Sequence, residues 1–288
     1  MTVKTGGNMY TTLKPVLKKA IQMNMAIGAF NAHNLEMTQA IVKAACAEGV
    51  PVIIQTSEGT AKFVGMKSFV AVCKSLSVEY GIDVVLHLDH ARNWDNIKEA
   101  IDAGYSSIMY DGSHLPFKEN VLATQHVVEY AHTAGASVEG ELGTIGGTED
   151  GIAVDPDAVE FTKPADAVKF VELTDVDALA VGIGTNHGQY KSKTKLRFDV
   201  LQAIHESVNI PLVVHGGTGV SDEDIHKVIN GGIRKFNVGT ELLVNWNKIS
   251  ADLYSTNKEN TSTRNNVIPA LEAIQKIVQG KIELFKNL

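Results

Sequence analysis

The stretch "DVVLHLDHARN" (83–93) ends an apolar run with three ionisable side chains, His87, Asp89 and His90. A strand that only had to pack would not end in a carboxylate and two imidazoles. Such groups transfer protons near neutral pH and bind metal ions. We therefore expect chemistry at Asp89 and His90. His87 lies inside the run, two residues before Asp89, and we expect it to be structural or to support a neighbouring ligand.

Histidines also stand at the ends of two later apolar runs. "GTNHG" contains His187, and "HGGTG" begins with His215. Any one of them alone is more often an ordinary surface or core histidine. Three histidines at equivalent strand ends, one of them beside a carboxylate, favour a shared metal ion. Zinc in catalytic sites is commonly bound by three protein ligands of this kind.

Two glycine-containing loops predict a binding site for an anion. "HGGTG" (215–219) and "NVGT" (237–240) follow neighbouring strand candidates. Backbone N–H groups and threonine hydroxyls in such loops can surround phosphate oxygens, and glycine lets the oxygens approach closely. A single Gly-Gly pair is usually just a turn, but two loops at adjacent strand ends favour a phosphate. Local amide dipoles would then capture an anion on a protein whose net charge is −7.

These residues must be held by a repeating arrangement of strands and helices. Amphipathic segments such as 35–49, 94–105, 120–135 and 222–232 alternate with short, mostly apolar runs, as expected for parallel strands buried on both faces. The strand candidates are 26–31, 51–56, 83–89, 106–111, 136–142, 178–183, 211–216 and 233–239. This pattern predicts an α/β protein, a single (β/α)8 TIM barrel with its site at the carboxyl ends of the strands. An open doubly wound sheet is the alternative.

No linker rich in Gly, Pro or Ser divides the chain, so we expect one domain over residues 1–288. Its C-terminal extension, 241–288, is helical in pattern and is interrupted by "STNKENTSTRNN" (255–266). A polar interruption of this kind is either a solvated loop or an arm that reaches a neighbouring subunit.

Composition excludes several classes of protein. Hydrophobic residues make up 44% of the chain and charged residues 20%, as in globular proteins. No Lys/Arg-rich run offsets the net negative charge, so nucleic acid and anionic membranes are not expected as partners. The chain has no apolar segment of membrane-spanning length, and "MTVKTGGNMY" lacks the apolar core of a signal peptide. Cys46 and Cys73 lie in helix-like apolar patterns, typical of reduced thiols, and we expect a cytoplasmic protein.

Taken in order, six segments resemble the class II, zinc-dependent ketose-bisphosphate aldolases, which include fructose- and tagatose-bisphosphate aldolases. The segments are "AFN", "HLDH", "DGSHLPFKEN", "SVEGELGTIGGTEDG", "HGGTG" and "KFNVGTE". The resemblance runs from Met9 onward, and residues 1–8 look like an extension ahead of the family's usual start. It implies reversible retro-aldol cleavage of a ketose 1,6-bisphosphate to dihydroxyacetone phosphate and glyceraldehyde 3-phosphate. It also implies one catalytic Zn²⁺, a monovalent cation near the phosphate site, and a homodimer or homotetramer.

The resemblance assigns metal and proton-transfer roles position by position. The zinc ligands it implies are His90, His187 and His215. Asp89 matches the residue that exchanges a proton with the C4 hydroxyl. Glu141 matches a carboxylate that approaches the metal when the metal shifts, and Glu149 matches a carboxylate on a mobile loop that handles the proton at C3.

Substrate contacts follow from the same resemblance. The positions that match the cradle for dihydroxyacetone phosphate are Gly188, Gly216, Gly217, Thr218, Asn237, Gly239 and Thr240. Asn31 and Ser57 look like polar contacts to the substrate. In "STRNNVIPA", Arg264 aligns with an arginine that reaches the far phosphate of a neighbouring subunit's substrate, although the surrounding tail departs from the commoner "PRKYLGPA".

Three rival functions remain open at this point. A Schiff-base aldolase needs a lysine inside the barrel, and Lys235 is the only lysine in the strand candidates. A metallohydrolase could use the histidines but has no need for two glycine loops. A sugar-phosphate sensor that does not catalyse would have no use for Asp89 and Glu149 beside the ligands.

Substrate choice depends on the third position of the "N-x-x-T" segment, which is Gly239 here. In the family this position helps to distinguish substrates, since larger polar residues are common in fructose types and a small residue occurs in tagatose types. We expect the gap left by the missing side chain to give relaxed or tagatose-leaning specificity.

Overall fold

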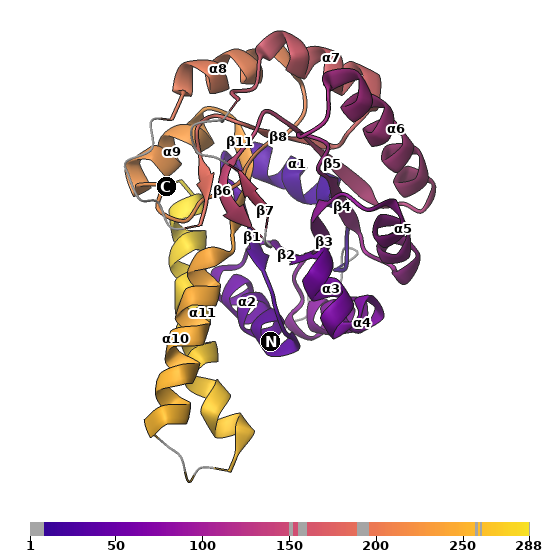
Figure 1. Cartoon of the computed structure of the whole chain (residues 1–288). Coiled ribbons are helices and arrows are strands. Elements are labelled where there is room, and N and C mark those ends of the chain that lie inside the picture. Colours follow the sequence, from indigo (N-terminus) through magenta and orange to yellow (C-terminus); the bar gives the residue numbers. More distant parts are fainter. Residues whose placement is uncertain are drawn as a thin grey trace.

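Eight parallel strands close into a barrel in the computed structural model, which describes residues 9–149, 152–154, 160–188, 196–256, 259 and 261–287 (Figure 1). Around the barrel the order is β1-β2-β3-β4-β5-β8-β10-β11, with β11 hydrogen-bonded back to β1. Closure confirms the predicted (β/α)8 barrel and excludes the open doubly wound sheet. The proposed extension at residues 1–8 lies outside the described residues.

All eight predicted strands are present, with bounds within a few residues of those expected. The barrel strands are β1 (Ile27–Asn31), β2 (Val52–Ser57), β3 (Val84–Ala91), β4 (Ser107–Tyr110), β5 (Ser137–Leu142), β8 (Ala178–Val181), β10 (Leu212–Val214) and β11 (Ile233–Val238). The outer helices are α2 (Leu35–Glu48), α3 (Glu58–Val64), α4 (Met66–Tyr80), α5 (Trp94–Ala103), α6 (Phe117–Thr133), α7 (Pro164–Thr174), α8 (Phe198–Ser207) and α9 (Asp222–Asn230).

Helix caps keep the connections at the barrel's carboxyl end short. The side chains of Asn34, Asn93 and Ser221 each accept a hydrogen bond from a backbone N–H in the first turn of the helix that follows. At the opposite end of the barrel, where the helices lead back into strands, Gly49 and Gly104 end α2 and α5 in the left-handed conformation, which costs glycine little. Strands β1 and β3 therefore pass into α2 and α5 through short, defined loops, whereas longer segments follow β5 and β8.

One helix ahead of the first strand was not among the predicted helices. This helix, α1 (Leu13–Met23), packs against β1, β5 and β11 through Leu13, Val16 and Leu17. The backbone N–H of Lys14 donates to the hydroxyl of Ser137, the first residue of β5. Helix α1 therefore covers the amino-terminal end of the barrel and leaves the carboxyl end as the place for a site.

A small second sheet follows β5 and β8, where a glycine-rich loop was expected. Strand β6 (Gly146–Glu149) pairs antiparallel with β7 (Ile152–Val154) and parallel with β9 (Asn186–His187). In this register Gly147 lies opposite His187. The sheet thus joins the segment that carries Glu149 to the segment that carries His187.

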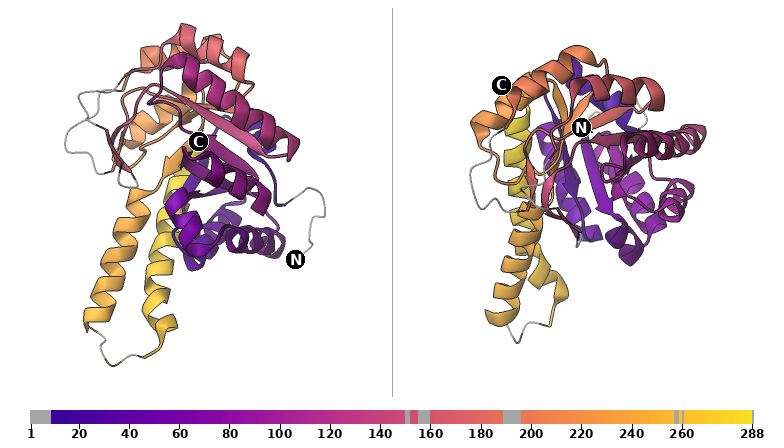
Figure 2. Two further views of the ribbon diagram at one scale, coloured as in Figure 1. Left: turned by 45° about the vertical axis from the view of Figure 1, so that its right-hand side comes forward. Right: turned by 45° about the horizontal axis from the view of Figure 1, so that its top comes forward.

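The C-terminal extension is a long helical hairpin, as its pattern predicts. Helices α10 (Thr240–Thr256) and α11 (Thr263–Phe285) run side by side and project well beyond the barrel (Figures 1 and 2). The C-terminal half of α11 returns to the barrel and packs against α2, α9 and β1. The start of α10 is also anchored in the core, through Leu242, and the tip of the hairpin stands away from its own barrel (Figure 1).

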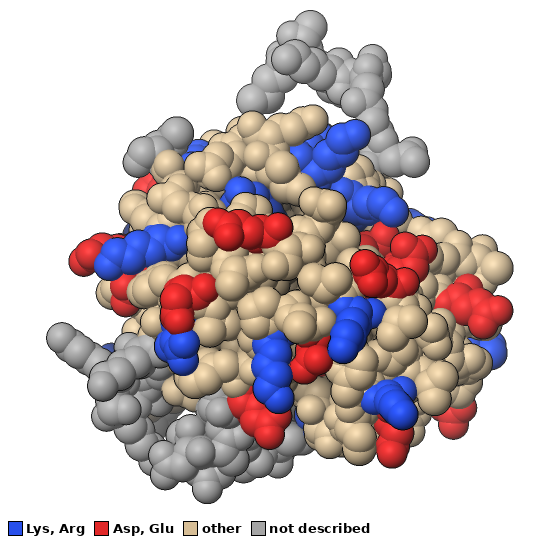
Figure 3. Space-filling model, turned by 90° about the horizontal axis from the view of Figure 1, so that it is seen from above, with Lys and Arg blue, Asp and Glu red and all other residues tan. Residues whose placement is uncertain are grey.

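The described residues on the face drawn in Figure 3 form no basic patch, and no described helix could span a membrane. On the described part of the face in Figure 3, lysines and arginines lie interspersed with acidic residues. Among the described helices, α11 included, none combines the length and the apolar character that crossing a bilayer requires.

The anchoring of α11 can be tested at Phe285. This ring is fully buried and stacks on Phe236 of β11 with the ring centroids 4.9 Å apart. Phe285→Ala would leave a cavity between the hairpin and the barrel and should lower the free energy of unfolding by about 3–5 kcal/mol, measured by urea denaturation. Leu122→Ala on α6, where the side chain is 66% exposed, serves as the control and should change it by less than about 0.5 kcal/mol. Equal losses in the two variants would refute this account.

Candidate active site

A backbone irregularity places two consecutive residues of β3 at the barrel mouth. Successive side chains of a regular strand point to opposite faces, so Asp89 and His90 should diverge. Instead, the register between β3 and β4 shifts between Leu88 and Ala91, and His90 has a φ of 47°. Bulges of this kind re-aim side chains next to active sites, and a left-handed non-glycine residue is an outlier typical of functional positions.

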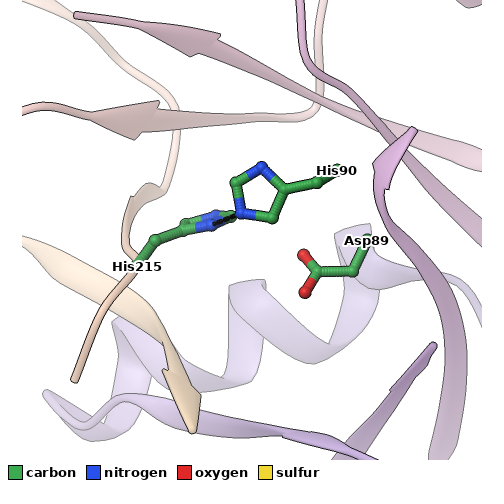
Figure 4. A group of neighbouring side chains, drawn as sticks. All are labelled: Asp89, His90 and His215. Carbon is green, nitrogen blue, oxygen red and sulfur yellow. Dashed lines mark hydrogen bonds between the residues drawn. The ribbon is translucent and has the colours of Figure 1, made fainter. Parts of the chain in front are cut away.

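Two of the three predicted histidines meet at this mouth. His215 follows β10, is fully buried, and has its Nδ1 atom 2.8 Å from Nε2 of His90. The two rings meet edge to face, and the carboxylate of Asp89 lies beside them (Figure 4). One potential ligand atom from each of the three residues lies within 4.8 Å of the others. The third histidine, His187, has its backbone in β9, and its side chain lies outside the described residues.

A second group of potential ligands shares His90. Its Nδ1 atom lies 3.4 Å from Oδ2 of Asp111 and 3.7 Å from Oε2 of Glu141. One ligand atom from each of these three residues again lies within 4.8 Å of the others. His90 therefore stands between two neighbouring sets of potential ligand atoms, and Glu141, predicted as an alternate metal contact, belongs to the second set.

Burial and neighbouring charges shift the pKa values of the two carboxyl groups of this second set in opposite directions. Burial alone would raise the pKa of Asp111, but hydrogen bonds with His90, Ser113 and Arg92 outweigh it and hold that pKa well below its usual range. Arg92 donates to Oδ2 of Asp111 from both Nε, at 2.9 Å, and Nη2, at 2.5 Å. Burial raises the pKa of Glu141 well above its usual range, and the negative charge of Asp111 raises it further. Of the two carboxyl groups beside His90, Asp111 is therefore the one whose ionised form is favoured.

Three amide groups hold the carboxylate of Asp89. Asn31 of β1 and Gln55 of β2 donate to its Oδ2 atom at 3.2 and 2.9 Å, and Asn237 of β11 donates to Oδ1 at 3.3 Å. Gln55 also donates to Oδ1 of Asn31 at 2.7 Å. Sequence reasoning assigned no role to Gln55, although a buried glutamine inside "PVIIQT" was a visible signal.

The residues of the predicted phosphate cradle line one small common hollow. It is lined by Asn31, Gly188, Gly216, Gly217, Thr218, Asn237, Gly239 and Thr240. Gly216 has a φ of 71°, and a Cβ there would collide with the backbone of Asn186 in β9. Glycine is therefore required where the loop after β10 approaches the second sheet.

The space beside Gly239 is filled, although the missing side chain was expected to leave a gap there. A Cβ at this position would lie 2.7 Å from Oδ1 of Asn31, so the Asn31 amide occupies the gap that was expected to be open. Closure of the barrel between β11 and β1 is the physical reason. Any effect of Gly239 on specificity must therefore act through the position of Asn31.

Three further predicted residues, Ser57, Glu149 and Arg264, do not have side chains that the structure shows among these groups. Ser57 lies opposite Asp89 in the barrel register, and its hydroxyl caps α3 by accepting from the N–H of Thr60. The backbone of Glu149 lies in β6, and its side chain is outside the described residues. Arg264 is exposed in the first turn of α11, at the far end of the hairpin, and is not part of its own chain's barrel mouth.

Lys235, the candidate for a Schiff base, lies inside the barrel rather than at its mouth. It is fully buried, and its Nζ atom is 2.9 Å from Oε2 of Glu139. An ammonium group held in an ion pair lacks the lone pair that attack on a carbonyl requires. The geometry therefore disfavours the lysine mechanism.

Comparison with known proteins identifies the family of this chain. The family described as "Fructose-bisphosphate aldolase class-II" matches residues 11–288. A fructose-bisphosphate aldolase of Staphylococcus aureus (strain Mu50 / ATCC 700699) is 43% identical over 279 residues, which are 95% of this chain and 96% of the relative. One from Geobacillus stearothermophilus is 41% identical over 277 residues, with the same coverage of both chains. The crystal structure of the YdjI aldolase from Escherichia coli K12 matches with a TM-score of 0.84 and 31% identity over 96% of this chain and 97% of that one.

A (β/α)8 barrel that matches aldolases over almost its whole length is an aldolase, a lyase that breaks a carbon–carbon bond. The chain belongs to the class-II fructose-bisphosphate aldolase family. This confirms the resemblance seen in the sequence and the reaction class that it implied, cleavage of a phosphorylated ketose. The family is generally zinc-dependent, and the described residues at the mouth include two groups that could hold a metal ion.

Proposed function

We propose that this chain catalyses the reversible, zinc-dependent cleavage of a ketose 1,6-bisphosphate to dihydroxyacetone phosphate and glyceraldehyde 3-phosphate. The convergence of Asp89, His90 and His215 beside the glycine-lined hollow carries the proposal, because two imidazoles and a carboxylate that could serve as ligands and base lie next to a loop that could receive an anion. Zinc would be held by His90, His187 and His215, and Glu141 supplies an alternate carboxylate. The donor set fits zinc, which favours imidazole nitrogens. When bound, the ion supplies a Lewis acid that polarises the ketone.

Asp89 is proposed to exchange the proton of the C4 hydroxyl. Its carboxylate is oriented by amides from three strands and lies one residue from a proposed ligand, so the backbone sets its distance from the reacting carbons. Glu149 is proposed to handle the proton at C3 from the β6 segment. Two separate carboxylates would then serve the two proton transfers.

The hollow is proposed to bind the phosphate of the dihydroxyacetone phosphate half. Backbone N–H groups of Gly188, Gly216 and Gly217 and the hydroxyls of Thr218 and Thr240 would surround the phosphate oxygens, with Asn237 and Gly239 completing the cradle. Asn31 and Ser57 are proposed as polar contacts to the sugar. A monovalent cation near this phosphate is part of the proposal.

The far phosphate is proposed to be bound by Arg264 of a neighbouring subunit. In its own chain Arg264 stands at the exposed far end of the hairpin, so it can act on a substrate only across an interface. We therefore propose a homodimer or homotetramer that acts in the cytoplasm on a small phosphorylated sugar, with neither nucleic acid nor membrane as a partner.

The metal requirement is tested by assaying release of triose phosphate before EDTA treatment, after it, and after zinc is restored. Activity should disappear with chelation and return with zinc. His187→Ala should lose bound zinc and activity together, because a proposed ligand is removed, whereas His205→Ala on the outer helix α8 should keep both. Activity that is indifferent to EDTA, or full zinc occupancy in His187→Ala, would contradict the proposed metal site.

The proton-transfer role is tested by Asp89→Ala. This variant should retain zinc and lose cleavage by roughly two to four orders of magnitude, the usual scale for loss of a general acid or base. Metal content and kcat are measured on the same preparation. Asp95→Asn, at an exposed carboxylate in the first turn of α5, is the control and should keep its kcat. A kcat in Asp89→Ala within tenfold of the parent would rule out the assignment.

Specificity is tested by comparing kcat/KM for D-fructose 1,6-bisphosphate and D-tagatose 1,6-bisphosphate. The names of the relatives support fructose 1,6-bisphosphate as a substrate. The missing side chain at Gly239 is proposed to give relaxed or tagatose-leaning specificity by leaving Asn31 in its present position. Gly239→Asn should shift the ratio toward fructose. Gly239→Ala should shift the ratio in the same direction, because its Cβ alone displaces Asn31 without adding a new polar group. A strong fructose preference in the unaltered enzyme would sink the relaxed-specificity hypothesis.

A further inference from the structure

A layer of polar side chains lies inside the barrel, beneath the histidines of the mouth. Lys235 of β11, Glu139 of β5, His87 of β3 and Ser107 of β4 are all fully buried. The interior of such barrels is normally filled by branched apolar side chains. Replacing a buried ion pair by apolar residues is often neutral or stabilising, so stability alone is a poor reason for this pair.

Glu139 links this layer to the mouth. Its Oε1 atom lies 2.8 Å from Nε2 of His215 and 3.2 Å from Nζ of Lys235, and its Oε2 atom lies 2.9 Å from the same Nζ. His87 closes the other side, with Nε2 3.8 Å from Oε2 of Glu139 and Nδ1 2.8 Å from the hydroxyl of Ser107. The carboxylate therefore sits between a fixed cation and one ring nitrogen of His215.

This contact decides which nitrogen of His215 carries the hydrogen. A carboxylate held by an ammonium group can only accept hydrogen bonds, so Nε2 of His215 must be the donor. A neutral imidazole then has its lone pair on Nδ1. In the structure Nδ1 is the atom that faces Nε2 of His90 at 2.8 Å and Nδ2 of Asn237 at 3.2 Å, at the barrel mouth.

We propose that Glu139, anchored by Lys235, is a positioning residue that fixes the tautomer and ring orientation of His215 and so presents Nδ1 to zinc. The inference rests on the proposed function, in which His215 is a zinc ligand. Partners of this kind around metal-binding histidines typically change metal affinity 10–100-fold when they are removed. His87 contacts Glu139 rather than the mouth, which agrees with the supporting role expected for it.

Two double variants separate the hydrogen bond from the buried charges. Lys235→Met/Glu139→Gln and Lys235→Met/Glu139→Met both remove the ion pair and have similar volumes. Only the Glu139→Gln substitution keeps an oxygen that can accept from Nε2 of His215. Zinc affinity, measured by competition with a chromogenic chelator, should stay within about threefold of the parent in the glutamine variant and fall about 10–100-fold in the methionine variant. Equal affinities in the two variants, at whatever level, would overturn the proposal.

A second measurement covers the case in which a variant fails to fold. In the metal-free parent protein, ¹⁵N NMR of labelled histidines reports the tautomer of His215, with His215→Asn used only to assign its signals. Hydrogen on Nε2 is expected, and hydrogen on Nδ1 would overturn the proposal. A parent protein that binds no zinc would refute the proposed function and this inference together. Zinc binding in the parent with equal affinities in the two double variants refutes the inference alone.

Discussion

Hydrogen bonding between β1 and β11 closes the sheet, with Ile27 opposite Lys235 and Phe30 opposite Val238. Closure of eight parallel strands brings every carboxyl end to one mouth. It is the reason that Asn31 and Asn237, more than two hundred positions apart in the chain, both donate to Asp89. The filled space beside Gly239 has the same origin, since β1 carries Asn31 against the end of β11.

The sequence predicts the fold and much of the site because these depend on local patterns. Apolar runs mark all eight barrel strands, and polar groups at the ends of the runs mark Asp89, His90 and His215, which the structure brings together. The glycine loops predict the hollow, since close backbone approach at Gly216 tolerates no Cβ. In these cases the residue type alone indicates the local structural requirement, such as burial, a polar strand end or a close backbone approach.

Contacts between distant segments are what local patterns could not predict. Strand β6 looks like a glycine-rich loop in the sequence, and one of its two partners, β9, lies about forty residues later in the chain. Gln55, Glu139 and Lys235 interrupt apolar runs, but whether they meet depends on barrel register and curvature. The left-handed conformation of His90 is equally invisible, since nothing in "HLDH" marks a bulge.

Each proposed reactive group is held from a different direction. Amides of β1, β2 and β11 hold Asp89, the Arg92–Asp111 pair contacts one side of His90, and Glu139 of β5 contacts His215. No single loop could supply all of these partners, so the precision of the site derives from the rigid barrel. A shift of one residue in any of these strands would turn its partner to the opposite face. The polar interior is thus consistent with a site supported from below as well as from its rim, and the ion pair beneath His215 is the deepest part of that support.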